Sequence, residues 1–268
     1  MLLIQVNYLF FLIIFLSFYF SNFSRYFLRI ILNKDIYFDK LNNVILFKYL
    51  KVLNKLIHYF PELTKSQIKQ FKMLPVLYNY WNSKINVISR KDIAEIETRH
   101  ILHSLSIAKF FSFNNGSNLL DVGTGGGFPG IPLAIMFPKV QFHLTDSIGK
   151  KIKVVNAIIK DLNLTNAFGE QIRSENLDFE YDFIVNRAVS NMSKLVSLVG
   201  AKISKKNTHK FKNGIISLKG GDLSKEIRPF KKAKVYKINQ IFNESFFETK
   251  KVIHLPIPYM GKDIQLAD

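Results

Sequence analysis

The sequence predicts an α/β protein with a doubly wound, mostly parallel sheet and a helical N-terminal lobe. From Leu119 onward, short apolar runs alternate with helical patterns of roughly 10–15 residues, an order typical of parallel sheets covered by helices on both faces. Residues 64–111 instead carry apolar side chains at helical spacing. The two closing apolar runs, 235–242 and 251–257, are also compatible with an antiparallel edge.

Two stretches form the predicted lobe. In residues 64–89, apolar side chains recur at helical spacing and are interrupted only by Pro75, which normally ends or kinks a helix. Residues 91–111 place their apolar side chains close to one face, which predicts another helix or a pair of helices.

The sheet follows a turn at residues 112–118, which is rich in Ser, Asn and Gly. We predict strands at 119–122, 140–146, 181–189, 214–220, 235–242 and 251–257, and helices at 131–137, 150–164 and 193–203. In such a fold the carboxyl end of the first strand borders the ligand crevice.

The composition favours an anionic partner and argues against metal chemistry. Lys and Arg number 38 against 20 Asp and Glu, which gives the 268-residue chain a net charge of +18. Such a charge attracts long polyanions, although a solvated lysine-rich surface is the alternative. Cysteine is absent, and the six histidines show no metal-binding spacing. We therefore expect neither disulfides nor a catalytic metal.

The N-terminal segment has a different composition from the rest. Residues 1–24 carry no charged side chain, and an apolar run extends from Tyr8 to Leu16. Three interpretations remain open. The first is a membrane anchor with Arg25, Arg29 and Lys34 on the cytoplasmic side. The second is a signal peptide, against which stands the lack of a basic n-region and of a cleavage site. The third is upstream DNA translated from an early start codon.

The stretch "LLDVGTGGGFPGIP" at 119–132 carries most of the functional information. Five glycines fall within eight residues behind a strand that ends near the acid Asp121. Glycine permits positive φ and leaves no Cβ, so a ligand can contact the backbone directly. A tight turn without a ligand needs fewer glycines, and we therefore predict a ligand site.

Two classes of ligand fit this loop. Residues Gly125 to Gly130 match G-x-G-x-x-G, with Asp146 about twenty residues farther on, as in dinucleotide-binding proteins. However, Asp121 would repel a diphosphate at that place. S-adenosyl-L-methionine fits better, because its ammonium and sulfonium groups are cationic. Asp146 could bind the ribose hydroxyls of either cofactor.

Several segments together resemble one protein family. They are "WNSKINVISRKD", "RHILHSL", "DVGTGGGFPGIPLAI", "LTDSIGKKIKVV", "DFIVNRAV" and "SLKGG". Their placement is similar to that in the bacterial small-subunit ribosomal RNA guanine-N7 methyltransferases, the glucose-inhibited division protein B family. The resemblance covers about residues 52–256. It implies a Rossmann-like methyltransferase fold and three regions: an apolar extension at 1–50, a helical lobe at 51–112 and a methyltransferase domain at 113–268.

The resemblance also implies which residues hold the cofactor S-adenosyl-L-methionine. Gly123, Gly125 and the neighbouring amides would bind its methionine part near Asp121, with Phe128 packing against it. Asp146 would bind the ribose. The segment "QIRSEN" at 171–176 matches the place where the family holds the adenine, so Ser174 and Glu175 are assigned there.

A second group of residues would face the guanine. The N7 atom of guanine carries a lone pair and no proton, so its methylation needs no general base and depends on positioning. We hypothesise that Arg187, which would also close the cofactor site, and Lys219 steer the guanine or its phosphates. The opposing wall would be Arg99, His100 and Asn86. The family commonly has an acid where this chain has His103, so the role of that acid is in doubt here.

The partner implied by the resemblance is 16S rRNA in the small ribosomal subunit, bound by a monomeric cytoplasmic protein. Residues 201–237 hold 12 Lys or Arg against the two acids Asp222 and Glu226, which suits contacts with phosphates. A membrane would be a partner only if the N-terminal apolar segment is a real anchor. Two other functions remain open: a nucleotide-dependent oxidoreductase and a non-catalytic RNA-binding module.

Overall fold

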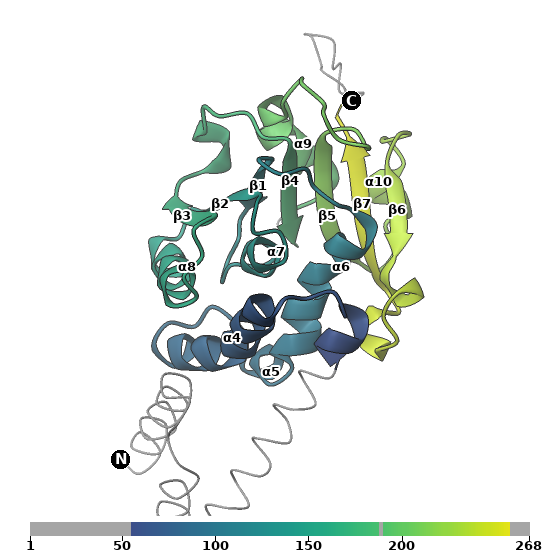
Figure 1. Ribbon diagram of the computed structural model, residues 1–268. Helices are drawn as coiled ribbons and strands as arrows, with labels where there is room; N and C mark the ends of the chain where they lie inside the picture. Colours follow the sequence, from purple (N-terminus) through teal and green to yellow (C-terminus); the bar gives the residue numbers. More distant parts are fainter. Residues whose placement is uncertain (1–54, 188–189, 258–268) are drawn as a thin grey trace, which may run out of the picture. The chain divides into compact units, whose positions relative to one another are not determined.

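The computed structural model describes residues 55–187 and 190–257 (Figure 1). Its centre is a seven-stranded sheet in the order β3-β2-β1-β4-β5-β7-β6. The strands are β1 (Asn118–Val122), β2 (Gln141–Asp146), β3 (Ala167–Gln171), β4 (Phe183–Arg187), β5 (Gly214–Gly220), β6 (Lys234–Lys237) and β7 (Lys250–Pro256). Strands β1 to β5 pair in parallel, whereas β7 is antiparallel to β5 and β6. The predicted fold class, including its antiparallel edge, is confirmed.

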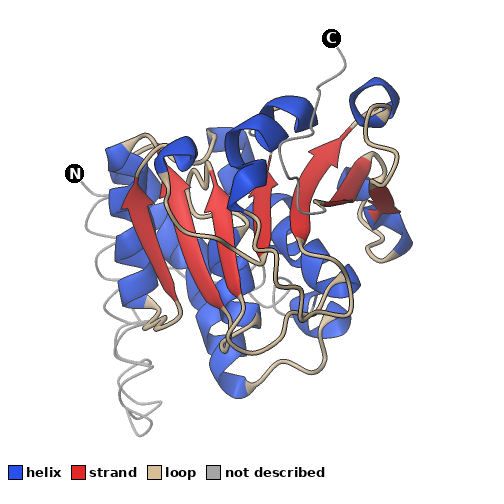
Figure 2. Cartoon of the chain, turned by 90° about the horizontal axis from the view of Figure 1, so that it is seen from above, coloured by secondary structure: helices blue, strands red, loops and turns tan. Residues whose placement is uncertain are grey.

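Helices cover both faces of this sheet (Figure 2). Helices α6 (His103–Phe110), α7 (Gly130–Met136) and α8 (Gly149–Asp161) pack on the first face. Helices α9 (Met192–Val199) and α10 (Ser224–Ile227) pack on the second. Successive residues of a strand point to opposite faces, so neighbours in one strand belong to different cores. The result is two apolar cores separated by the sheet.

Helix α4 (Lys65–Lys84) packs against α7 and α8 and runs without interruption through Pro75. The predicted interruption at this proline is therefore wrong. Thr64 caps the helix: its side chain accepts from the Gln67 backbone N–H at 3.3 Å. A proline inside a helix costs about 3 kcal/mol, whereas each large apolar side chain buried contributes about 1.5–3 kcal/mol. Four side chains of α4 are buried: Phe71, Leu74, Leu77 and Tyr78.

Residues 91–111 form a helix pair, which was one of the two predicted arrangements. The short helix α5 (Arg90–Ile93) leads into a π-helical stretch, η1 (Glu97–Leu102), that continues directly into α6. Short π-helical turns occur frequently at functional sites. Here the turn carries Arg99 and His100, two of the residues predicted to line the site.

Three features of the sheet region differ from the sequence prediction. Strand β3 was not predicted, because "AFGEQ" is largely exposed and lacks an apolar run. Helix α10 was not predicted either. The strand predicted over 235–242 ends at Lys237, where the chain turns into η4 (Ile238–Gln240). The turn buries Ile238 completely in the first-face core, which a straight continuation of the strand would not achieve.

The predicted N-terminal extension, residues 1–50, lies outside the described residues, and so do its three interpretations. The described residues all belong to one unit, Leu53–Asp268. Within 55–187 and 190–257, no helix has both the length and the apolar character that crossing a bilayer requires.

Candidate cofactor and substrate site

The glycine loop joins β1 to α7, as the sequence predicted. Its backbone has positive φ at Gly123 (+62°), Gly125 (+61°) and Gly127 (+98°), a region that side chains other than glycine rarely adopt. A Cβ placed on Gly125 would meet no atom within 4 Å. The loop therefore borders open space at Gly125, where a ligand could contact the backbone.

Asp121, the acid of this loop, is hydrogen-bonded to two other residues of the loop. Its Oδ2 accepts from the Thr124 hydroxyl at 2.6 Å and from the Gly130 N–H at 2.8 Å. The side chain is fully buried, and Oδ1 has no hydrogen-bond partner among the described residues. Burial raises the pKa of Asp121 to about 7, although both hydrogen bonds and the charge of Arg187 act in the opposite direction.

Gly130 is required because Asp121 approaches so closely. A Cβ at Gly130 would lie 2.7 Å from Asp121 Oδ2 and 2.7 Å from the Leu144 side chain. These distances are shorter than van der Waals contact allows. The last glycine of the motif therefore permits the close packing of α7 against the sheet, not the approach of a ligand.

Asp146 ends β2 and lies beside the same loop. Its Oδ2 accepts from the Gly125 N–H at 3.0 Å, and its Oδ1 accepts from the Ile148 N–H at 2.9 Å. Lys151 Nζ lies 3.5 Å from Oδ2. The structure thus brings the predicted ribose-binding acid into contact with the predicted methionine-binding loop.

The helical lobe covers the glycine loop. The buried Tyr78 of α4 donates from its hydroxyl to the Gly126 carbonyl at 2.6 Å. A Cβ at Gly126 would lie 3.3 Å from the Val87 side chain. The backbone N–H of Val87 donates to Asn82 Oδ1 at 2.7 Å, which fixes the position of Val87. Asn86, predicted as part of the wall, is an exposed neighbour of this contact.

Phe128, predicted to pack against the cofactor, is buried among side chains of the protein. Its ring stacks on Tyr78 with centroids 4.7 Å apart, and His100 meets it edge-on at 4.8 Å. The guanidinium carbon of Arg187 lies 5.1 Å from the ring centroid. Phe128 therefore joins the loop to the lobe and to β4.

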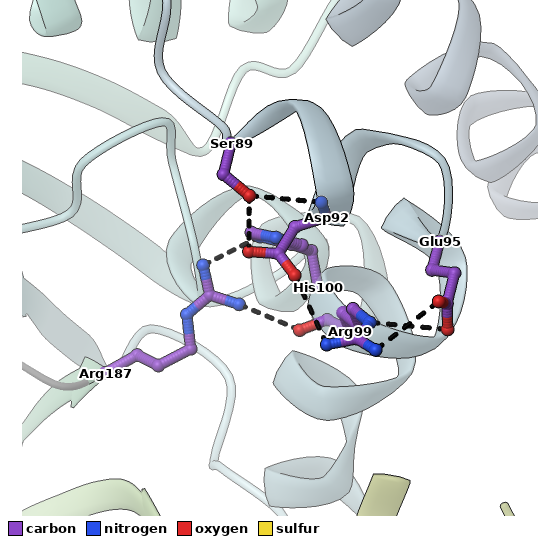
Figure 3. A network of polar contacts seen from close by, with 6 residues as sticks. All are labelled: Ser89, Asp92, Glu95, Arg99, His100 and Arg187. Atoms are coloured by element: carbon purple, nitrogen blue, oxygen red, sulfur yellow. Dashed lines mark hydrogen bonds and ion pairs between the residues drawn. The ribbon is translucent and has the colours of Figure 1, made fainter.

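Arg187 meets the two predicted wall residues, Arg99 and His100 (Figure 3). Its Nη1 donates to the Arg99 carbonyl at 3.1 Å, and its Nη2 lies 2.8 Å from His100 Nδ1. A guanidinium has no acceptor, so His100 Nδ1 must accept and the ring proton must sit on Nε2. Burial, with a smaller effect from Arg187, lowers the pKa of His100 to about 3, so the ring is neutral at pH 7.

Arg99 contributes its backbone to this contact while its side chain points elsewhere (Figure 3). The guanidinium bridges Asp92 Oδ1, 3.4 Å away, and Glu95 Oε2, 3.3 Å away. Asp92 in turn accepts from the Ser89 hydroxyl at 2.8 Å. The Arg99 side chain therefore ties η1 to α5.

Lys219, predicted to steer the guanine, is engaged by the protein itself. Its Nζ lies 2.6 Å from Glu226 Oε1 and donates to the Ser190 carbonyl. Glu226 Oε1 also accepts from the Met192 N–H at 2.7 Å. The pair thus connects β5 and α10 to the start of α9, close after Arg187 in the chain.

The predicted adenine-binding residues lie in the turn η2 (Ser174–Asn176) after β3. Ser174 is buried, with its Oγ 3.3 Å from Thr145 Oγ1, whereas Glu175 is exposed. His103 lies apart from these residues. It is buried and meets the rings of Phe246 and Phe247 edge-on.

Sequence reasoning did not identify several residues that support the site. Thr124 and Gly130 lie within the motif itself. Their spacing from Asp121 could have predicted that this carboxylate accepts hydrogen bonds from its own loop. Tyr78 and Glu226 gave no such indication, because they meet the site only through long-range contacts. Asn186 is also fully buried; its Nδ2 donates to Ser217 Oγ at 2.8 Å, and its Oδ1 has no partner among the described residues.

Comparisons with known proteins agree with the motif resemblance. Residues 67–254 match the family model described as GidB, rRNA small subunit methyltransferase G. The chain is 56% identical over 207 residues to ribosomal RNA small subunit methyltransferase G of Flavobacterium psychrophilum, covering 77% of this chain and 99% of the relative. The enzyme of the same name from Bacteroides fragilis is 49% identical over 203 residues, which cover 75% of this chain and 98% of the relative.

Among solved structures, a SAM dependent methyltransferase from Aquifex aeolicus aligns with 61% of this chain and 97% of its own, at a TM-score of 0.45 and 14% identity. That likeness is too weak to carry an argument. The family assignment rests on the match over 67–254 and on the relatives aligned over nearly their whole length. The chain belongs to the rRNA small subunit methyltransferase G family.

Proposed function

We propose that the protein methylates N7 of a guanine in 16S rRNA, with S-adenosyl-L-methionine as the methyl donor. The observation that carries this proposal is the glycine loop after β1: it borders open space at Gly125 and lies between two buried acids, Asp121 and Asp146. The family to which the chain belongs supports the same substrate class.

The residues at this loop fit a cationic cofactor. Asp121 Oδ1 is a buried acceptor without a partner among the described residues, and such an oxygen is complementary to an ammonium donor. Gly123 and Gly125 would hold the methionine part, Asp146 the ribose, and Ser174 and Glu175 the adenine. The bound cofactor supplies an electrophilic methyl group.

The sheet order speaks against the oxidoreductase alternative. Dinucleotide-binding folds typically have a mostly parallel sheet with the strand order 3-2-1-4-5-6, whereas this sheet has the antiparallel β7 between β5 and β6. In addition, a diphosphate at the glycine loop would approach the buried carboxyl of Asp121, which is unfavourable.

The chain's own residues would act by positioning. N7 has no proton to lose, so no general base is needed, and catalysis comes from alignment and from the exclusion of water. Arg187, held by His100 and the Arg99 carbonyl, would fix the guanine or its phosphate. Lys219 would act through the segment 190–192, to which it is bonded directly and through Glu226.

The natural substrate would be the small ribosomal subunit or its rRNA, encountered in the cytoplasm by a monomer. A direct test incubates the protein with small subunits that lack the modification and with cofactor labelled with tritium in its methyl group. Label at a guanine of 16S rRNA supports the proposal. An unlabelled rRNA under saturating conditions, with subunit binding retained, would indicate a non-catalytic RNA-binding module.

Titration calorimetry tests the cofactor. We expect S-adenosylhomocysteine to bind and NADH not to bind; the opposite result would favour the oxidoreductase. Gly125→Val should abolish binding, because its φ of +61° disfavours a β-branched residue and the side chain would enter the open space.

Arg187→Ala should lower kcat/KM at least tenfold. Full activity of this variant would contradict its assigned role.

A further inference from the structure

The edge of the sheet farthest from β3 carries a basic surface next to the candidate site. Residues 221–237, here called the basic edge, comprise α10, β6 and the turn between them. Six of their basic side chains are exposed: Lys225, Arg228, Lys231, Lys232, Lys234 and Lys237. Among the described residues, none of the six forms an ion pair with a carboxylate. Their charge is therefore available to an external partner.

The basic edge adjoins the carboxyl end of β5, whose neighbour in the sheet is β4 with Arg187 at its end. Lys219 of β5 pairs with Lys251 of β7, and Lys251 pairs with Lys237 of β6. Directly paired residues in antiparallel strands point to the same face. These three lysines thus form one row across the second face of the sheet. Arg187 pairs with Leu218, one position inside this row, and its side chain points to the first face. Lys219 is only 8% exposed and paired with Glu226, so a polyanion that passes over the carboxyl edge of the sheet from the site would meet Lys251 and Lys237.

The second face of this edge is hollowed. A groove of about 340 Å³ lies between α10 and the strands β6 and β7. Its floor is apolar, with Leu223, Ile227 and Val235, and Arg228 and Lys251 also line it. The acid that shares this lining, Asp222, accepts hydrogen bonds from the Ser224 N–H and hydroxyl, each at 3.0 Å. The net charge around the groove is positive.

We propose that the basic edge binds the phosphate backbone of the rRNA beside the methylated segment, and so holds the substrate while Arg187 positions the guanine. The inference rests on the proposed function for the identity of the RNA. Dispersed basic side chains without an ion pair among the described residues fit phosphate contacts better than base reading. An anionic membrane presents similar charges, but the basic edge adjoins the carboxyl end of β5, which lies beside the end of β4 that carries Arg187, and this favours the substrate itself.

The test compares two triple variants that each remove three charges. The first is Lys225→Gln, Arg228→Gln and Lys237→Gln, all on or beside the groove. The matched control is Lys150→Gln, Lys153→Gln and Lys160→Gln on α8, whose side chains are also exposed and without an ion pair among the described residues. Helix α8 packs on β2 and β3, at the opposite edge of the sheet.

Binding to unmodified small subunits is measured as a function of salt, together with methylation kinetics. Removing one lysine–phosphate interaction lowers the slope of log affinity against log salt by about 0.7–0.9, so the slope of the groove variant should fall by about 2–3. Its KM should rise about 10- to 100-fold with kcat unchanged within about twofold. The α8 variant should change neither quantity by more than about threefold.

Equal effects of the two triple variants would overturn the proposal, because the net charge of the protein, and not the position of the charges, would then explain RNA binding. An unchanged salt slope in the groove variant would overturn it as well. Binding to vesicles of anionic phospholipid tests the membrane alternative. If the groove variant loses vesicle binding while its KM is unchanged, the surface binds a membrane instead. If the wild type binds subunits with the expected salt slope but methylates nothing, the proposed methyltransferase function is wrong, whereas the assignment of the basic edge to RNA binding is retained.

Discussion

The glycine loop (residues 121–130) and the basic edge (residues 221–237) solve different problems with different chemistry. In the loop, Asp121 Oδ2 accepts from the Thr124 hydroxyl and the Gly130 N–H, and no residue is fully exposed. At the basic edge, six charged side chains reach solvent without ion pairs among the described residues. The loop determines atomic positions, whereas the edge contributes a field that acts over about 8–10 Å at physiological salt.

This difference predicts how each region responds to change. A misplaced atom in the loop meets close-packed neighbours, so its effect should be steep and independent of salt. Removal of a charge at the edge should have a graded effect that high salt abolishes. The following variants sharpen or break that contrast.

Gly130→Ala should have the largest effect. Its Cβ would lie 2.7 Å from Asp121 Oδ2 and from Leu144, so either the Asp121 hydrogen bonds break or α7 moves. We expect a loss of about 2–4 kcal/mol in the free energy of unfolding, measured by denaturant titration, and at least tenfold weaker binding of S-adenosylhomocysteine.

Gly116→Ala is the control for that variant. Gly116 also has a positive φ, +81°, but a Cβ there would meet nothing within 4 Å. Only the backbone strain remains, about 1–2 kcal/mol. If the two substitutions lower the free energy of unfolding equally, the close contact of Gly130 with Asp121 and Leu144 does not determine the loop structure.

Asp121 should couple cofactor binding to pH. Burial raises its pKa to about 7, so a large fraction of the free protein carries this proton at pH 6. A bound cation favours the carboxylate and lowers that pKa, so binding releases the proton. Affinity should therefore rise with pH up to about 7 and then level off.

Calorimetry of S-adenosylhomocysteine binding in two buffers of different ionisation enthalpy measures this proton. We expect a release that approaches one proton at pH 6 and falls toward zero above pH 8. The control is Asp121→Asn, which cannot ionise and should show no release. A release that survives this substitution would assign the linkage to another group.

Glu226→Gln should have a smaller effect; Glu226 lies in the basic edge and connects it to Lys219 and to the Met192 N–H at the start of α9. Gln keeps an acceptor for the Met192 N–H but removes the charge opposite Lys219, whose side chain is only 8% exposed. We expect about 1–2 kcal/mol lower stability and a lower kcat with little change in KM, because segment 190–192 loosens. A change in KM alone would instead place Glu226 in RNA binding.

Tyr78→Phe should have the smallest effect. It removes the hydroxyl that donates to the Gly126 carbonyl at 2.6 Å but keeps the ring stacked on Phe128. The expected loss is about 1 kcal/mol in unfolding free energy, with the salt dependence of RNA binding unchanged. A changed salt slope would show that loop geometry and edge electrostatics are not separable.

Much of the architecture could be predicted from the chain alone. The alternation after Leu119 indicated a doubly wound sheet, since strand and helix periods differ and each is a local property. The glycines and the acid of 119–132 indicated a ligand loop for a similar reason: positive φ and the absence of Cβ are properties of the residues themselves. The exposed β3 gave no such pattern and was missed.

Only the tertiary structure decided which side chains meet. Arg187 and His100 are 87 positions apart, and Lys219 donates to the carbonyl of Ser190, 29 positions away. Local pattern carries no information about such pairs, because they depend on how the elements pack and where each rotamer points. For the same reason Pro75, a helix breaker by its own chemistry, lies inside α4, where the burial of four apolar side chains outweighs its cost.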